Sequence, residues 1–141
     1  MTPVITVTDA PSAAAAAVIE NGLARYNKAQ AGYADSRPLA VLVSDPDTRT
    51  VIGGLLGRTS LGLAFIDLVF LPDEVRGKDV GRRMMREAED EARRRLCRSV
   101  VLYTISFQAP GFYERLGYRR FGEIDCDPPG TRRIFLVKEL S

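Results

Sequence analysis

Hydrophobic and polar positions along the chain predict a domain that mixes helices with strands. The clearest helical segment runs from about Val80 to Leu96, where apolar residues recur every four positions at Met84, Ala88 and Ala92. Acidic residues precede arginines by four positions in three pairs, Glu89–Arg93, Asp90–Arg94 and Glu91–Arg95. Such pairs stabilise an exposed helical face. We therefore expect one face of this helix in the core and the other in solvent.

Two further helices and a series of strands are predicted around this segment. A helix begins after Ser12 and runs to about Gln30, and a shorter one covers 109–116, with Pro110 in its first turn and Gly117 after its end. Runs rich in β-branched and aromatic residues predict strands over 4–8, 39–44, 51–58, 64–71, 99–105, 118–124 and 132–137. This order favours the α/β class, with a mixed sheet and helices on its faces.

Length and composition exclude several kinds of protein. The 141 residues are enough for one domain, and the prediction is a single domain over 1–141. The sequence has no histidine and only two cysteines, which excludes Ser-His-Asp and Cys-His nucleophiles and any zinc site that needs imidazole. No metal site is expected. Neither a signal pattern nor a membrane-length apolar run is present, so we expect a cytoplasmic protein without a membrane partner.

Charge is distributed unevenly and gathers at one predicted helix start. Residues 76–141 carry 15 basic and 10 acidic side chains, whereas residues 1–75 carry 5 and 8. Four cations, Arg76, Lys78, Arg82 and Arg83, surround the start of the helix that follows the buried strand 64–71. The positive end of a helix dipole disfavours cations unless an anion lies among them, which indicates a phosphate-bearing ligand. A solvated basic surface is the alternative. Arg93, Arg94 and Arg95 have acidic partners, and no nucleic acid is expected.

Two motifs in this half of the sequence resemble motifs of a known protein family. Arg76-Gly77-Lys78-Asp79-Val80-Gly81 resembles the R/Q-x-x-G-x-G/A loop that binds acetyl-CoA in the GNAT N-acetyltransferase superfamily, and it lies between a strand and a helix as that loop does. Downstream, Ser106-Phe107-Gln108-Ala109 and the segment from Phe112 to Tyr118 resemble the family's N-x-x-A and [FY]-Y-x-x-x-G-[FY] segments. Each motif alone is weak, but the two together are specific. The resemblance covers about residues 39–140.

The resemblance implies a fold and a cofactor. The fold is a mixed, mostly antiparallel sheet of about six or seven strands, with helices on both faces and splayed central strands. The co-substrate is acetyl-CoA, and the reaction is direct attack by a primary amine in a ternary complex. The residues implied in holding acetyl-CoA are Val69, Phe70, Leu71, Arg76, Gly77, Lys78, Asp79, Val80, Gly81, Arg82 and Ser106. The N–H of Phe70 is the candidate donor to the oxyanion.

Two residues are candidates for catalysis. Tyr113 matches the family's usual general acid, since a phenol near the leaving thiolate can donate its proton, and the alternative is a core tyrosine. Asp67 is the one charge within an apolar strand, which makes it a candidate general base or amine-binding carboxylate. Asp67 on a wetter face of the strand, or in a structural bond, is the equal alternative.

Some positions depart from the family pattern. Asp79 stands where the family has glycine, and Ser106 where it has asparagine. Asp tolerates a left-handed backbone, but its carboxylate repels a pyrophosphate. The alternative function is therefore a catalytically degenerate module that binds CoA or another anion. Glu123, Asp125 and Asp127 near the last hairpin either steer a cationic acceptor or are solvated loop charges. The acceptor is expected to be a small-molecule or peptide amine, and homodimerisation is possible.

Overall fold

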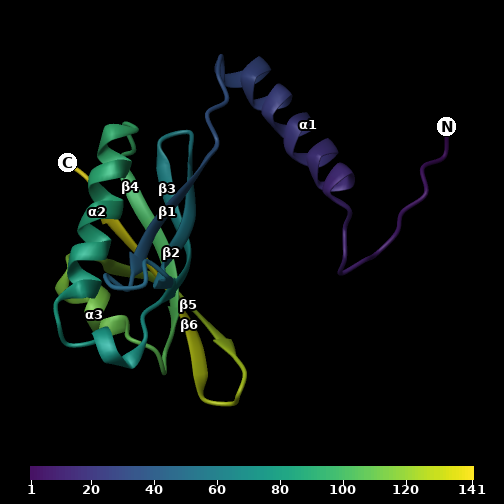
Figure 1. The fold of residues 1–141 in the computed structure, drawn as a ribbon. Coiled ribbons are helices and arrows are strands. Elements are labelled where there is room, and N and C mark those ends of the chain that lie inside the picture. The colour runs from purple at the N-terminus through teal and green to yellow at the C-terminus, as the bar shows by residue number, and fades with distance from the viewer. The chain divides into compact units, whose positions relative to one another are not determined.

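The computed structural model describes residues 1–141, which divide into two units, Met1–Asp35 and Ser36–Ser141 (Figure 1). In the first unit, helix α1 (Ala13–Ala31) begins at Ser12, whose hydroxyl accepts a hydrogen bond from the N–H of Ala15 at 3.1 Å. The predicted helix is confirmed. The predicted strand at 4–8 is wrong, because no other strand pairs with this segment. None of the helices is long and apolar enough to cross a membrane.

The second unit is built on one six-stranded sheet in the order β1-β2-β3-β4-β6-β5. Only β3 and β4 run parallel, and every other neighbouring pair is antiparallel. The predicted mixed, mostly antiparallel sheet is therefore confirmed. The strands are β1 (Arg37–Ser44), β2 (Val51–Ser60), β3 (Leu63–Phe70), β4 (Ser99–Ile105), β5 (Arg119–Cys126) and β6 (Thr131–Glu139).

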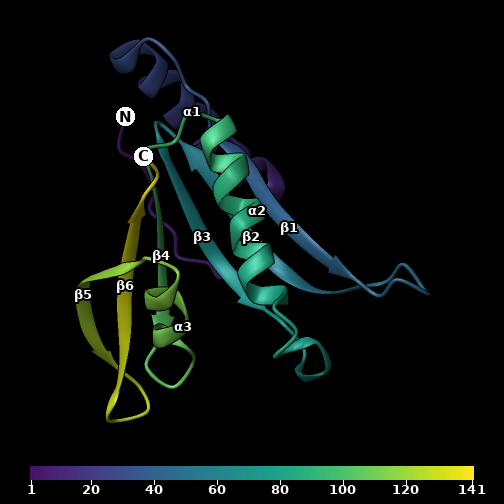
Figure 2. The same cartoon turned by 90° about the vertical axis from the view of Figure 1, so that its left-hand side faces the viewer.

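Helices α2 (Val80–Arg94) and α3 (Pro110–Arg115) lie on the same side of this sheet (Figures 1 and 2). Helix α2 buries Met84, Met85, Ala88 and Ala92, which confirms the predicted apolar stripe. The core contains this stripe, side chains of β1, β2, β3, β4 and β6, Tyr113 of α3, and Cys97, Tyr118 and Leu140. A short 3₁₀ turn (Asp73–Val75) joins β3 to α2.

The charged face of α2 differs in part from the prediction. The Glu91–Arg95 pair is confirmed at 2.8 Å, but Arg93 and Arg94 bond acids three positions back, Asp90 and Glu91. Glu89 is buried instead of exposed. Its carboxylate accepts hydrogen bonds from the Tyr118 hydroxyl at 2.9 Å and from the Lys138 ammonium at 2.8 Å. The predicted surface pair Glu89–Arg93 was wrong because the end of β6 brings a second cation to this side of the helix.

Strands β3 and β4 separate halfway along their length. Their parallel pairing covers only Leu63–Ile66 against Ser99–Leu102. Directly after this point the register of β3 against β2 shifts, since Gly57 opposes Ile66 while Leu56 opposes Leu68. Asp67 is thus the extra residue of a β-bulge, which bends a strand and increases its twist. The edge of β3 that faces β4 has no strand partner beyond Ile66.

A glycine in β2 makes this bulge possible. A Cβ atom at Gly57 would lie 2.1 Å from the carbonyl oxygen of Phe65 and 3.1 Å from the Cα of Ile66. Both are backbone atoms, so the two strands would have to move apart. Gly57 therefore lets β3 approach β2 closely beside the bulge.

We predict that Gly57→Ala destabilises the protein and that Gly122→Ala does not. Gly122 also lies in a strand, but a Cβ there meets no atom within 4 Å. Overpacking at Gly57 should lower the free energy of unfolding by about 1–3 kcal/mol or more. Urea unfolding followed by circular dichroism measures both variants. Equal stability of the two would contradict the close-approach argument.

Candidate active site

The separation of β3 and β4 opens into a cavity of about 1020 Å³. Its lining comes from β3, the loop before α2, the first turn of α2, β4, α3 and β6. Some of these residues, such as Met84 and Tyr113, lie on the helix side of the sheet, and others, such as Tyr103 and Arg133, lie on strand faces that point away from α2. The cavity is therefore reached from both faces of the sheet.

Backbone N–H groups without a hydrogen-bond partner in the helix line this cavity at the start of α2. The first helical hydrogen bond runs from the N–H of Arg83 to the carbonyl of Asp79, and no side chain caps the preceding amides. The N–H groups of Val80, Gly81 and Arg82 thus have no partner within the helix, which is the usual arrangement at an anion-binding helix terminus. Gly81 also lets α3 approach, because a Cβ there would lie 3.1 Å from the Phe112 ring.

Asp79 precedes the helix in a left-handed conformation, with φ of 66°. The backbone at this position is therefore one that glycine adopts most easily and that aspartate tolerates. The carboxylate accepts two hydrogen bonds from the guanidinium of Arg82, at 2.7 and 2.6 Å. These bonds hold the pKa of Asp79 below its usual value, so the carboxylate stays charged at neutral pH. Arg82 is thereby held at the cavity, with an internal anion as its partner.

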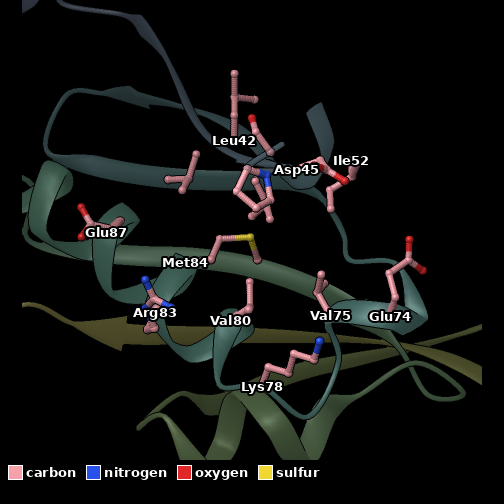
Figure 3. Close-up of a pocket in the computed structure, with 14 residues that line it drawn as sticks. Leu42, Asp45, Ile52, Glu74, Val75, Lys78, Val80, Arg83, Met84 and Glu87 are labelled. Atoms are coloured by element: carbon pink, nitrogen blue, oxygen red, sulfur yellow. The ribbon is translucent and has the colours of Figure 1, made fainter. Parts of the chain in front are cut away.

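The other predicted loop cations are placed differently. Arg76 lines the cavity and is bound within the loop, donating to the carbonyl of Leu71 at 3.1 Å and pairing with Asp73 at 2.9 Å. Lys78 does not line this cavity. Figure 3 shows it instead at a second hollow of about 720 Å³, between β1 with its following turn and the start of α2, beside Val80.

Tyr113 lies on α3 and lines the large cavity although only 7% of its surface is exposed. Its ring packs edge-on against Phe112 and Tyr118, at centroid distances of 5.1 and 6.0 Å. Burial raises the pKa of the Tyr113 hydroxyl above its ordinary value. The phenol is therefore protonated at neutral pH.

Tyr118 is a second buried tyrosine nearby, but it has a structural partner. Its hydroxyl donates to the carboxylate of Glu89, and burial together with that negative charge strongly raises its pKa. Its proton is held in this bond, and Tyr118 is not among the residues that line the cavity. Of the two tyrosines, only Tyr113 lines the cavity.

Asp67, the bulge residue, also lines the cavity. Its side chain is half exposed and lies 3.4 Å from the guanidinium of Arg58, which in turn stacks on the Phe65 ring at 4.5 Å. Both interpretations of this residue from the sequence have a counterpart here, because Asp67 lines the cavity and its carboxylate also has an ion-pair partner. A contact this long and exposed leaves the carboxylate accessible to a ligand.

Most of the residues proposed from the sequence come together here, and two do not. Those that line the cavity are Asp67, Val69, Phe70, Leu71, Arg76, Gly77, Asp79, Val80, Gly81, Arg82 and Tyr113. Besides Lys78, Ser106 lies outside the lining, and its hydroxyl accepts a hydrogen bond from the N–H of Arg132 at 3.0 Å. Ser106 thus ties the end of β4 to β6.

Among the polar and aromatic residues of the cavity that were not proposed from the sequence are Tyr103, Arg115 and Arg133. Tyr103 and Arg133 lie outside both motifs, and only the alternation within β4 and β6 could have placed them on one face. Glu123, Asp125 and Asp127, the acidic residues considered from the sequence as groups that steer the acceptor, do not line the cavity. Glu123 pairs with Arg120 at 3.1 Å and with Arg132 at 3.0 Å.

Comparison with known proteins agrees with this geometry. The model of the acetyltransferase (GNAT) family matches residues 12–118. Acetyltransferase Atu2258 of Agrobacterium fabrum is 33% identical over 134 residues, which cover 95% of this chain and 97% of that protein. Blasticidin-S acetyltransferase of Streptomyces morookaense is 37% identical over 109 residues, covering 75% and 80%. The crystal structure of an acetyltransferase from Bacillus cereus superposes with a TM-score of 0.76 at 25% identity, covering 96% and 98%.

The chain therefore belongs to the acetyltransferase (GNAT) family. It is an N-acetyltransferase by class, as the resemblance of its two motifs implied. The α/β fold class with a mixed sheet is confirmed as well, but α2 and α3 lie on one side of the sheet and not on both faces as expected (Figures 1 and 2).

Proposed function

We propose that this protein transfers the acetyl group of acetyl-CoA to a primary amine of a small molecule, by direct attack in a ternary complex. One observation carries the proposal. A single cavity joins the unpaired amides at the start of α2, the free edge of β3 and Tyr113, and it is lined from both faces of the sheet. A cofactor and an acceptor can thus meet within the sheet.

The proposed binding of the cofactor follows from the groups at the start of α2. The amides of Gly77 to Arg82 would hold the pyrophosphate, with Arg82 and Arg76 supplying charge. The pantetheine would lie along the free edge of β3, where Val69, Phe70 and Leu71 line the cavity. A strand edge without a partner offers regularly spaced donors and acceptors, which suits an amide-containing arm.

The reaction needs a nucleophile, an oxyanion donor and a proton donor. The neutral amine attacks the thioester carbonyl, the carbon–nitrogen bond forms, and the carbon–sulfur bond breaks. The N–H of Phe70 is proposed to bind the developing oxyanion. The Tyr113 hydroxyl is proposed to protonate the leaving thiolate, while the amine gives up a proton to water or to a base.

Asp67 is proposed to serve the acceptor. It lies at the point where β3 leaves β4, so its carboxylate faces the region through which an amine reaches the thioester. There it can bind the ammonium form of the acceptor or accept its proton. The Arg58 pair at 3.4 Å fixes the side chain without covering it.

A relative's name suggests the first acceptor to try. The Streptomyces morookaense protein is named a blasticidin-S acetyltransferase, and it is 37% identical to this chain. We propose a small-molecule amine as the acceptor class on that ground, with blasticidin S as its first member to test.

One observation favours a second candidate, an anion-binding module without transferase activity. The carboxylate of Asp79 already occupies the guanidinium of Arg82, where the phosphates of the cofactor would bind. Release of thiol from acetyl-CoA in the presence of amines distinguishes the two, because a binding module takes up CoA without releasing thiol.

We predict that acetyl-CoA binds the wild-type protein in calorimetric titration and that Arg82→Glu weakens binding roughly tenfold or more, since it removes a charged hydrogen-bond donor. Arg94→Glu is the matched control, an exposed arginine of the same helix paired with Glu91 at 2.8 Å. It should bind like the wild type. Equal losses in both variants would refute a phosphate site at the helix start.

We predict that Tyr113→Phe lowers kcat by roughly 10²–10⁴-fold, the usual contribution of a general acid, and retains acetyl-CoA binding. The ring contacts with Phe112 and Tyr118 are kept. Because burial raises the pKa of Tyr113 above 10.0, the acid form persists through neutral and mildly alkaline pH. Wild-type kcat should therefore rise with pH as the amine deprotonates, and it should show no alkaline decline below pH 10.0. An alkaline decline that disappears in Tyr113→Phe would contradict the direction of the shift.

We predict that Asp79→Asn tightens acetyl-CoA binding severalfold. Asparagine keeps the tolerance of a left-handed backbone, while the change removes a negative charge from the phosphate site and frees Arg82. Asp90→Asn, which breaks the remote pair with Arg93, is the control and should leave the affinity unchanged. Weaker binding by Asp79→Asn would show that the carboxylate positions Arg82 for the ligand.

A further inference from the structure

Arg133 brings an unpaired cation into the cavity. It lies on β6 opposite Ile105, and its guanidinium carbon is 5.8 Å from the centre of the Tyr103 ring. The same ring also packs against Phe135, with centroids 5.7 Å apart. Stacking on an aromatic ring holds a guanidinium in place while its N–H groups stay free for a ligand.

The structure gives Arg133 no carboxylate partner, in contrast to its neighbour. Arg132 pairs with Glu123 at 3.0 Å, on the opposite face of the strand. Arg133 forms none of the ion pairs and side-chain hydrogen bonds of the protein, although its side chain is only partly exposed. A half-buried guanidinium without a partner, aimed into a cavity, is suited to a carboxylate ligand, which it can bind with two hydrogen bonds.

Arg133 lies on the face of the sheet that points away from α2. Along β6, Ile134 and Leu136 are buried and Lys138 bonds Glu89 of α2, so Arg133 and Phe135 face the other way. The same holds on β4, where Leu102 and Thr104 are buried and Tyr103 is exposed. The amides and cations at the start of α2 lie on the other side of the sheet, where α2 packs. Asp67 and Arg133 lie on β3 and β6, the two neighbours of β4 in the sheet.

We propose that Arg133 binds a carboxylate of the acceptor, and that the acceptor is accordingly an amine that carries a carboxylate, with its amine directed to Asp67 and the thioester. This rests on the proposed function, since it names the acceptor class of that site. Asp67 and Arg133 would then bind the two opposite charges of one zwitterionic molecule, in a cavity that Tyr103 and Phe70 also line.

The test uses pairs of amines that differ only by the carboxylate. These are lysine and cadaverine, 6-aminohexanoate and pentylamine, and phenylalanine and phenethylamine. Thiol release from acetyl-CoA is measured with the full chain as wild type, Arg133→Gln, Arg133→Lys and Arg132→Gln. In the wild type, kcat/KM should favour the carboxylate-bearing member by roughly 10- to 100-fold, the range of a charge-assisted hydrogen bond.

Arg133→Gln should reduce this preference to about twofold or less, and Arg133→Lys should keep part of it, since it retains the charge without the planar fork. Arg132→Gln should keep the full preference. A wild-type preference for the carboxylate-free members overturns the inference while the proposed function stands. Loss of acetyl-CoA affinity in Arg133→Gln as large as in Arg82→Glu also overturns it, because Arg133 would then serve the cofactor. Absence of thiol release with every amine counts against the proposed function itself, and the inference fails with it.

Discussion

The bulge at Asp67 is the constraint on which the site depends. An extra residue in β3 shifts its register against β2 and bends the strand away from β4, so that parallel pairing ends at Ile66. Gly57 allows the close approach of β2 and β3 beside it. Without this bend, β4 would cover the edge of β3, and the sheet would have no opening through which residues of its two faces line one cavity.

A second constraint concerns charge at the start of α2. The backbone at Asp79 adopts a left-handed conformation, and the chain places a carboxylate there where the family pattern has glycine. That carboxylate offsets one of the cations at the positive end of the helix dipole, which explains how the helix tolerates Arg82 and Arg83 in its first turn. If Arg82 binds the phosphates of the cofactor as proposed, it does so in competition with Asp79, and the affinity for the ligand then depends on the balance between two anions.

Much of this could be predicted from the sequence, and the exceptions have physical causes. Helix α2 and strand β4 follow from periodicity and apolar runs, and the two motifs identified the loop and Tyr113. The strand predicted at 4–8 failed because a strand needs a neighbour, which local propensity does not reveal. Glu89 was misplaced because its partners, Tyr118 and Lys138, are far away in sequence. Lys78 and Ser106 illustrate a third cause, since a motif fixes a residue's position in a loop but not the direction of its side chain.

The position of Arg133 in the site could not be predicted from the sequence, because nothing in the neighbouring residues distinguishes it from Arg132. Arg132 and Arg133 are consecutive arginines with the same local context, and strand alternation alone sends them to opposite faces. One meets Glu123 and becomes structural, whereas the other meets Tyr103 and the cavity. The face therefore determines the role. Under the proposed function, one face of this sheet would supply donors and cations to the cofactor, and the other would supply Asp67, Tyr103 and Arg133 to the acceptor. Specificity for the acceptor can thus change on β3, β4 and β6 without altering the helix start that serves the cofactor.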